Sequence, residues 1–497
     1  MRGIFFFTFL IISNISWAQN GSIRGMVRDA ISNEKLPYAS ISLVDFSNGT
    51  VSNGNGAYVL DLAQISSFDT LLVSYMGYET SIFPVAILMK DSDLYLKPAA
   101  INLSDLPIYS RDLEVKDILV LIIKNFSRNY PKKNHHQRIF YHRYSTTPFN
   151  KENEIILKKS NFENIDKNSV AKIVEMIPDD IVQYQDAIID KYSFGDSIKL
   201  VPIEGISLEE NSNKDLETQI KEKFKSFSDA IENSLLDEDI YYKIGSGIFS
   251  GKIDSDDQNL EEEDQNDSED SLYFLVTTRY LKYDIKNLMT VAADIDSKDW
   301  EFVKSPRNYN YSKELTLFNN AWVYKIVFQP KEKGLYEGVM YVSVDNYAIL
   351  ELDFNYALGK NSQNFNLLGV SHSLKYKGAR VIYQKGPQGY FVKYINAEKN
   401  EFFSLDRNIF LVKKGKRFLF DKELNKVKLA LDMSFDTNSS WELLVINDQL
   451  LEQQPFEDIE EPKFMKFKKE FIYDPKMWEN PSVIVPNEEL QKYKRSQ

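Results

Sequence analysis

The sequence contains no cysteine, and this absence excludes disulfide bonds, thiolate metal sites and the lipid-anchored cysteine of a bacterial lipoprotein. It also lacks an apolar run of about 20 residues, the length that a helix needs to cross a bilayer. The chain must therefore be held together by a hydrophobic core. Its 497 residues are enough for two or three domains.

Histidine is scarce, and this limits the chemistry that the chain can perform. A zinc peptidase needs a motif such as H-E-x-x-H, but the cluster "HHQRIFYH" contains no acid. We interpret these side chains as exposed loop histidines, and the alternative is adventitious metal binding. The four histidines are His135, His136, His142 and His372.

Other catalytic signatures are missing as well. Ser169 and Lys172 match the short S-x-x-K pattern, but the companion motifs K-T-G and S-D-N are absent. No G-x-S-x-G elbow, phosphate-binding loop or dinucleotide-binding fingerprint is present. We therefore predict that the protein is not an enzyme, with no catalytic, cofactor-binding or metal-binding residues and no cofactor.

Positive charge is outnumbered: 60 Lys and Arg face 73 Asp and Glu, for a net charge of −13. Much of the excess lies in residues 254–270, which hold ten acids and no base. We predict an acidic disordered insertion over residues 251–271, because such a segment cannot bury itself. A calcium site is the alternative, but the spacing matches no rigid calcium loop. The charge balance also argues against a nucleic-acid partner.

The N-terminus has the pattern of a secretory signal. Arg2 precedes an apolar run over residues 4–12, and the small residues Ser16 and Ala18 precede a cleavage position. We expect residues 1–18 to be a signal peptide, and a short membrane anchor is the alternative. The protein is then exported and periplasmic or outer-membrane associated, and it is not a lipoprotein.

The next 80 residues read as short strands separated by turns. Ala39, Ile41 and Leu43 alternate with serines, as in a strand with one buried face. The stretch "GTVSNGNGAYVL" over residues 49–60 predicts a hairpin, with Asn53-Gly54 or Asn55-Gly56 in the turn. It is not a phosphate cradle, because a strand rather than a helix follows the glycines.

Five elements in order give this region a family resemblance: a "GMV" strand, "LPYA", "GT", "NG" and "SYMGYE". Residues 21–109 resemble the carboxypeptidase-regulatory-like domain found in exported proteins of Gram-negative bacteria. The resemblance implies a seven-stranded, transthyretin-like β-sandwich without catalytic activity. We place this domain at residues 21–98, followed by a linker over residues 99–111.

Two amphipathic helices are expected after the linker. The first lies between Ser110 and Pro131, and the second spans residues 214–236. Their apolar stripes indicate that both helices pack onto another element. The first stripe comprises Val115, Ile118, Ile122 and Phe126, and the second comprises Leu216, Ile220, Phe224, Phe227, Ile231 and Leu235.

The remaining chain is rich in long strands that follow one another as hairpins. Residues 272–420 predict an antiparallel meander and weakly resemble the half-barrel of periplasmic lipoprotein-carrier proteins. We assign residues 112–250 to the helix-containing first part of this α+β domain and residues 421–497 to an irregular C-terminal tail. The expected fold class is mainly β with some α: a seven-stranded sandwich followed by a larger curved sheet or half-barrel with packed helices.

These features predict an exported, non-enzymatic envelope protein in which a β-sandwich contact module is fused to a β-rich domain. Its expected partner is an envelope or outer-membrane protein that adds a strand to an exposed sheet edge. The first alternative is a periplasmic carrier that binds a lipid or other apolar ligand in a half-barrel. The second alternative is an unrecognised hydrolase.

Overall fold

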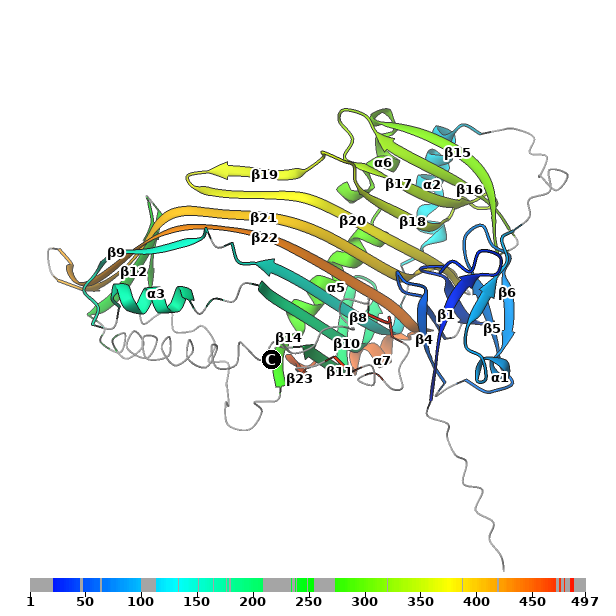
Figure 1. Cartoon of the computed structure of the whole chain (residues 1–497), viewed down its shortest axis with the longest axis horizontal. Helices are drawn as coiled ribbons and strands as arrows, with labels where there is room; N and C mark the ends of the chain where they lie inside the picture. The colour runs from blue at the N-terminus through cyan, green and yellow to red at the C-terminus, as the bar shows by residue number, and fades with distance from the viewer. Residues whose placement is uncertain are drawn as a thin grey trace, which may run out of the picture.

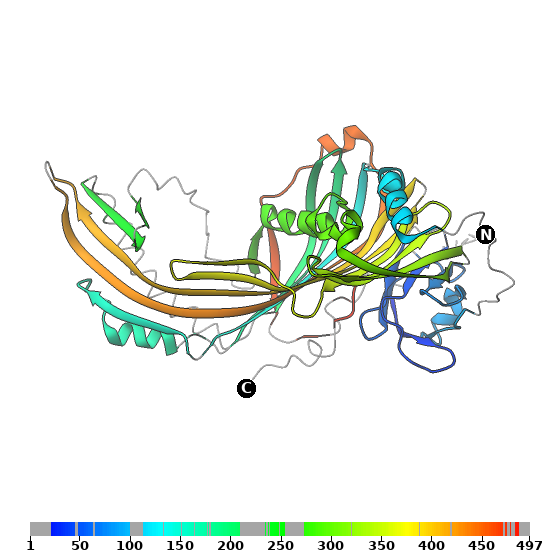
Figure 2. The same cartoon turned by 90° about the horizontal axis from the view of Figure 1, so that it is seen from above.

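The protein consists of a small β-sandwich and a much larger curved sheet that carries its two longest described helices on one side (Figures 1 and 2). Both parts belong to a computed structural model. It describes residues 21–486 with gaps at 45–47, 63–64, 100–112, 133, 151, 164, 176, 178–179, 209–233, 235–236, 238, 248, 254–272, 320, 387, 418–419, 471–472, 475–477 and 479–482. No helix in these ranges is long and apolar enough to cross a membrane. The mainly β fold class is confirmed.

The N-terminal sandwich has the predicted seven strands, divided between a three-stranded sheet (β4-β1-β7) and a four-stranded sheet (β3-β2-β5-β6). Aliphatic side chains of both sheets form its own core, which includes Val27, Ile41 and Leu71. The elements are β1 (Ser22–Asp29), β2 (Ser40–Leu43), β3 (Gly49–Val51), β4 (Ala57–Asp61), β5 (Thr70–Ser74), β6 (Ser81–Pro84), α1 (Val85–Leu88) and β7 (Leu94–Leu96).

The stretch "GTVSNGNGAYVL" forms the predicted turn, but the hairpin prediction is wrong. Strand β3 pairs with β2, whereas β4 pairs with β1, so the chain crosses from one sheet to the other. Asn53 builds the turn: its side-chain oxygen accepts hydrogen bonds from the backbone N–H groups of Asn55 and Ala57, each at 2.9 Å. Gly56 supplies the positive φ of 75°.

The large sheet has sixteen strands, and its central path ends with β18, β17, β16 and β15. Its longest strands, β21 and β22, have 27 and 29 residues. The strands are β8 (His135–Pro148), β9 (Glu154–Ser160), β10 (Asp180–Phe194), β11 (Ser197–Leu208), β12 (Ile240–Ser246), β13 (Phe249–Ile253), β14 (Tyr273–Thr277), β15 (Tyr309–Phe318), β16 (Ala321–Pro330), β17 (Tyr336–Ser343), β18 (Ile349–Tyr356), β19 (Ser362–Leu367), β20 (Val370–Gly386), β21 (Gly389–Gly415), β22 (Lys422–Leu450) and β23 (Phe464–Glu470).

Two helices cover the concave side of this sheet (Figure 2). The first predicted helix is present as α2 (Val115–Asn129), and its apolar stripe is buried as expected. Helix α5 (Thr278–Ala293) lies where the sequence predicted only meander strands, and Leu281 and Ile285 bury its inner face. The shorter helical elements are α3 (Lys167–Glu175), the 3-10 turns η3 (Lys298–Trp300) and η4 (Pro306–Asn308), α6 (Glu301–Lys304) and α7 (Gln453–Glu457).

The C-terminal region is not the irregular tail that the sequence predicted for residues 421–497. Strand β22 occupies its first 29 residues and pairs with β21, β8 and β9. Farther on, Trp478, Val483 and Ile484 are buried against the convex side of the large sheet. These side chains belong to a cluster that also includes Val51 and Val59 of the sandwich. The sandwich and the C-terminal segment thus cover the face opposite to α2 and α5.

Beyond the helices the long strands continue as a curved layer, which we call the distal arm (Figure 2). It comprises β19, residues 370–374 of β20, residues 399–415 of β21, residues 422–438 of β22, and strands β9, β12 and β13. Four sequence predictions lie wholly or largely outside the described residues: the signal peptide 1–18, the linker 99–111, the helix 214–236 and the acidic insertion 251–271.

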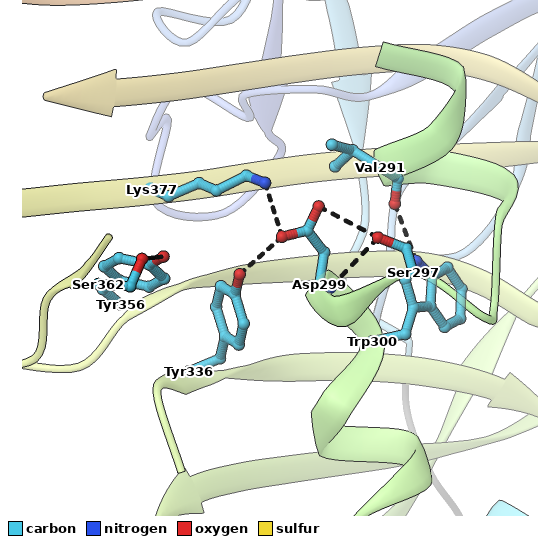
Figure 3. A network of polar contacts seen from close by, with 8 residues as sticks. All are labelled: Val291, Ser297, Asp299, Trp300, Tyr336, Tyr356, Ser362 and Lys377. Atoms are coloured by element: carbon cyan, nitrogen blue, oxygen red, sulfur yellow. Dashed lines mark hydrogen bonds and ion pairs between the residues drawn. The ribbon is translucent and has the colours of Figure 1, made fainter. Parts of the chain in front are cut away.

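A buried polar network fixes the chain between α5 and the sheet (Figure 3). Asp299 accepts hydrogen bonds from the Tyr336 hydroxyl at 2.7 Å and from the Lys377 ammonium at 2.6 Å. Next to it, the Trp300 indole N–H donates to the Val291 carbonyl at 2.9 Å. Residues of η3, β17, β20 and α5 are thereby joined at one point.

We expect Asp299→Ala to lower the free energy of unfolding by about 3 kcal/mol, because Lys377 and Tyr336 lose their shared acceptor. Urea denaturation followed by circular dichroism measures this loss. The matched control is Asp296→Ala at an exposed position three residues earlier, which should stay within about 0.5 kcal/mol of the wild type. Equal stability of the two variants would contradict the role of the network.

Candidate functional site

The histidines do not lie in an exposed loop, so that prediction is wrong. His135, His136 and His142 all belong to strand β8, and His142 is only 6% exposed. The strand begins earlier than the sequence suggested, because residues 135–148 pair continuously with β10. No group of three or more histidine and acidic side chains in the described ranges is arranged to hold a metal ion.

His142 belongs to a buried hydrogen-bonded cluster on the convex side of the sheet. Its Nδ1 lies 2.6 Å from one carboxylate oxygen of Asp186. The other oxygen accepts from the Tyr184 hydroxyl at 2.6 Å and from the Trp478 indole N–H at 3.2 Å. Burial disfavours the charged imidazole, but the attraction of Asp186 outweighs it and raises the pKa of His142. The cluster attaches the C-terminal segment to β10 and has no open side for a substrate.

Ser169 and Lys172 give no sign of acyl-transfer chemistry. Ser169 lies in the first turn of α3, and its hydroxyl donates to the Asp166 carbonyl at 2.9 Å. The Asp166 side chain in turn accepts the backbone N–H of Ser169 at 2.7 Å. Asp166 therefore caps the helix, and the partly buried Ser169 is its hydrogen-bonded partner in the first turn.

The distal arm has an unusual distribution of side chains, which makes it the main candidate binding surface. From Tyr394 to Lys413, β21 pairs with β22 without a register shift, so alternate residues stay on one face. Ile395 and Ala397 on this face belong to the helix-covered core. Farther along the same face, most side chains remain apolar, although Lys399, Glu401 and Arg407 interrupt them and neither α2 nor α5 extends over this part of the sheet (Figure 2).

We call this surface the distal apolar face and define it by cross-strand pairing. Seventeen apolar side chains are brought to it by the registers of the arm strands. They are Ile155, Leu157, Ile244, Phe249, Ile253, Phe365, Leu367, Val370, Phe403, Leu405, Ile409, Leu411, Val427, Leu429, Leu431, Met433 and Phe435.

Several of these side chains have an exposure that is high for apolar residues, whereas Val427 is buried. Phe249 is 58% exposed, Leu367 is 56% exposed and Phe403 is 39% exposed. The opposite face of the same strands is mainly polar and includes Asp406, Asn408, Asp432, Ser434 and Asp436. The arm is thus amphipathic, as a sheet covered on one face would be. Sequence reasoning missed this surface, although the alternation from Val427 to Phe435 was its signal.

Several polar contacts hold the sandwich to the large sheet at a boundary that we call the seam. The Asn53 amide of the sandwich donates to the Val485 carbonyl at 2.8 Å. The buried ammonium of Lys393 on β21 donates to the Gly49 carbonyl at 3.1 Å and to the Val445 carbonyl at 2.6 Å.

A compact ionic group lies at the same seam. The Arg380 guanidinium forms ion pairs with Asp353 and, at 3.4 Å, with Glu351. It also lies 4.4 Å from the centre of the Tyr38 ring of the sandwich, a cation–π distance. Burial raises the pKa of Glu351 to about 7, although Arg380 opposes this shift.

The comparison with protein families concerns the sandwich. Residues 23–106 match the model of the CarboxypepD_reg-like domain. The chain contains a carboxypeptidase-regulatory-like domain. A search of curated proteins found no match to the chain.

The regulatory-like domain is a β-sandwich protein-interaction module. In this protein the module packs directly against the large sheet. Its Val51 and Val59 share a hydrophobic cluster with Phe140 and Leu444 of the large sheet. Deleting the regulatory-like domain would therefore expose apolar side chains on β8 and β22.

We expect Lys393, at the seam with the regulatory-like domain, to make the free energy of unfolding depend on pH. Burial lowers the pKa of Lys393 to about 7 from 10.5. Between these values the folded protein binds fewer protons than the unfolded chain, so stability rises with pH. We expect the free energy of unfolding to increase from pH 7 to pH 9 by about 2 kcal/mol more in the wild type than in Lys393→Met. Urea denaturation at both pH values measures the difference, and identical pH slopes would contradict it.

Proposed function

We propose that the protein is an exported, non-enzymatic envelope protein that acts by binding a protein partner of the envelope or outer membrane. The observation that carries this proposal is the distal apolar face, a partly exposed apolar surface on one side of the distal arm, whose other side is mainly polar. Contiguous apolar surfaces of this kind mark interaction sites in folded proteins. The secretory pattern of residues 1–18 supports an envelope location.

Two further features support binding of a protein. The first is the regulatory-like domain itself, an interaction module that is fixed rigidly to the large sheet at the seam. The second is strand β13, whose five residues are all exposed and which pairs, among the described strands, only with β12. A partner strand can add to such an edge while its apolar side chains contact the neighbouring distal apolar face.

A second candidate function is binding of an apolar ligand such as a lipid. Beneath α2 and α5 the sheet is filled by packed side chains, among them Trp300, Phe302, Phe328 and Phe354. The observation that favours a lipid is again the distal apolar face, which offers half-buried aliphatic side chains over several adjacent strands. Lipid that co-purifies with the protein, detected by mass spectrometry, distinguishes this function from protein binding.

Site-specific photo-crosslinking in cells tests the main proposal. A photoreactive amino acid at Phe403, on the distal apolar face, should yield an adduct with an envelope or outer-membrane protein. The same probe at Asn408, on the polar face of the same strand, is the matched control and should yield little adduct.

Introducing Phe403→Glu at this surface should weaken association with the identified partner by about tenfold or more, because a charge then faces an apolar contact. Its effect on stability should be about 1 kcal/mol or less, since the side chain is 39% exposed. The control Asn408→Glu should bind normally. Equal adducts at both positions, or normal association of the Phe403→Glu variant, would contradict binding through this face.

Export is tested by the N-terminus of the protein recovered from cell fractions. We expect the chain to begin at Gln19, because cleavage follows Ala18, and to be found in the envelope fraction. Intact-mass measurement checks this assignment. A chain that retains residues 1–18 and fractionates with the cytoplasm would contradict export.

A further inference from the structure

A cavity of about 510 Å³ lies at the end of the helix-covered side, where β21 begins and β22 ends, at the opposite end of these strands from the distal apolar face. Its walls come from the C-terminal ends of α2 and α5, the start of β8, the β10–β11 turn, the β20–β21 turn and the end of β22. This volume lies within the range of small-molecule pockets, about 300–1,000 Å³. One wall is apolar and includes Ile198, Met289 and Phe391.

The cavity is also lined by a short network of polar groups. The Lys191 ammonium donates to the Gln137 side-chain oxygen at 2.6 Å. The Gln137 amide nitrogen donates to Asp448 at 2.7 Å, and His135 Nδ1 lies 3.0 Å from the same carboxylate oxygen. All four side chains line the cavity.

Lys191 is the unusual member of this polar network. It is only 5% exposed, and among the described residues it forms no ion pair with a carboxylate. An ammonium group carries three donors, and the neutral Gln137 oxygen occupies one of them. The negative charge of Asp448 stabilises the Lys191 ammonium, but this carboxylate accepts its hydrogen bond from Gln137. A buried positive charge therefore faces the cavity without a carboxylate in direct contact with it among the described residues.

We propose that this cavity binds an organic anion that joins one carboxylate or phosphate group to an apolar body. The anionic group forms with the Lys191 ammonium the direct ion pair that no described carboxylate makes. The apolar body lies against Met289, Phe391 and Ile198, which would otherwise border water. This site is independent of the protein-binding surface proposed above.

Isothermal titration calorimetry with the purified chain tests the proposal, with decanoate as the first probe. We expect saturable binding of decanoate and of decyl phosphate, weaker binding of decan-1-ol, which lacks the charge, and no detectable binding of acetate, which lacks the apolar body. The ratio between decanoate and decyl phosphate identifies the preferred head group. Decan-1-ol binding as tightly as decanoate would overturn the proposal.

Substitution of Lys191 tests the proposal more specifically than the choice of ligand does. Lys191→Met should weaken decanoate binding by about tenfold or more, while Lys124→Met, at an exposed position of α2 outside the cavity lining, should leave it unchanged. Thermal unfolding of both variants verifies that they are folded. Because a buried lysine could affect folding, Met289→Trp provides a second variant that narrows the apolar wall and should also weaken binding. Unchanged affinity in Lys191→Met would overturn the proposal.

The pH dependence of decanoate affinity distinguishes binding through the Lys191 charge from binding through apolar contacts alone. Burial lowers the pKa of Lys191 to about 8, so the ammonium loses its charge above this pH. Decanoate affinity should fall by about tenfold from pH 7 to pH 9 in the wild type. Lys191→Arg stays charged throughout, and its affinity should not fall. The other charged or titratable groups that border the cavity are Lys132, His135, Asp196, Lys286, Asp294 and Asp448.

The two proposals fail in different experiments. Phe403→Glu should leave decanoate binding unchanged, and Lys191→Met should leave the cellular crosslink at the distal apolar face unchanged. A pH-independent affinity in the wild type, or equal pH profiles of the wild type and Lys191→Arg, would overturn the anion site and leave the protein-binding proposal standing.

Discussion

The architecture depends on one constraint: the middle of a single sheet is apolar on both faces, and both faces must be covered. On the concave side Ile395 and Leu443 pack under α2 and α5. On the convex side Tyr394 and Leu444 pack under the regulatory-like domain and the C-terminal segment. Adjacent residues of the same strands thus belong to two different cores, and loss of either cover would expose apolar surface.

Because both faces are covered, the boundary between the regulatory-like domain and the large sheet contains part of a hydrophobic core. A regulatory-like domain joined by a free linker would contribute its own surface and nothing more. Here Val51 and Val59 complete the core of the neighbouring part, and Lys393, Arg380 and Asn53 add polar contacts. The sandwich is therefore both an interaction module and a structural element of the sheet. Its orientation relative to the distal arm is set by these contacts.

The sequence predicted the seven-stranded sandwich, α2 and the antiparallel hairpins, because these depend on local signals: turn residues, helical spacing and alternation. The predictions were wrong where the structure depends on a contact with a residue that is far away in the sequence. His142 looked like a loop residue because Asp186, its partner, lies 44 residues away. The two-residue period from Val427 to Phe435 was present but lay in a region read as a tail. The cavity around Lys191 combines residues from five segments and has no local signature.

The length of β21 and β22 has a mechanical consequence. Their shared ladder runs from Tyr394 near the seam to Gly415 at the far end of the arm, with a single register shift next to Lys413. Its hydrogen bonds lie across the strand direction. A force along the arm therefore acts perpendicular to these hydrogen bonds and does not open them one after another. The ladder makes the distal arm a continuous extension of the part of the sheet that the two hydrophobic cores hold.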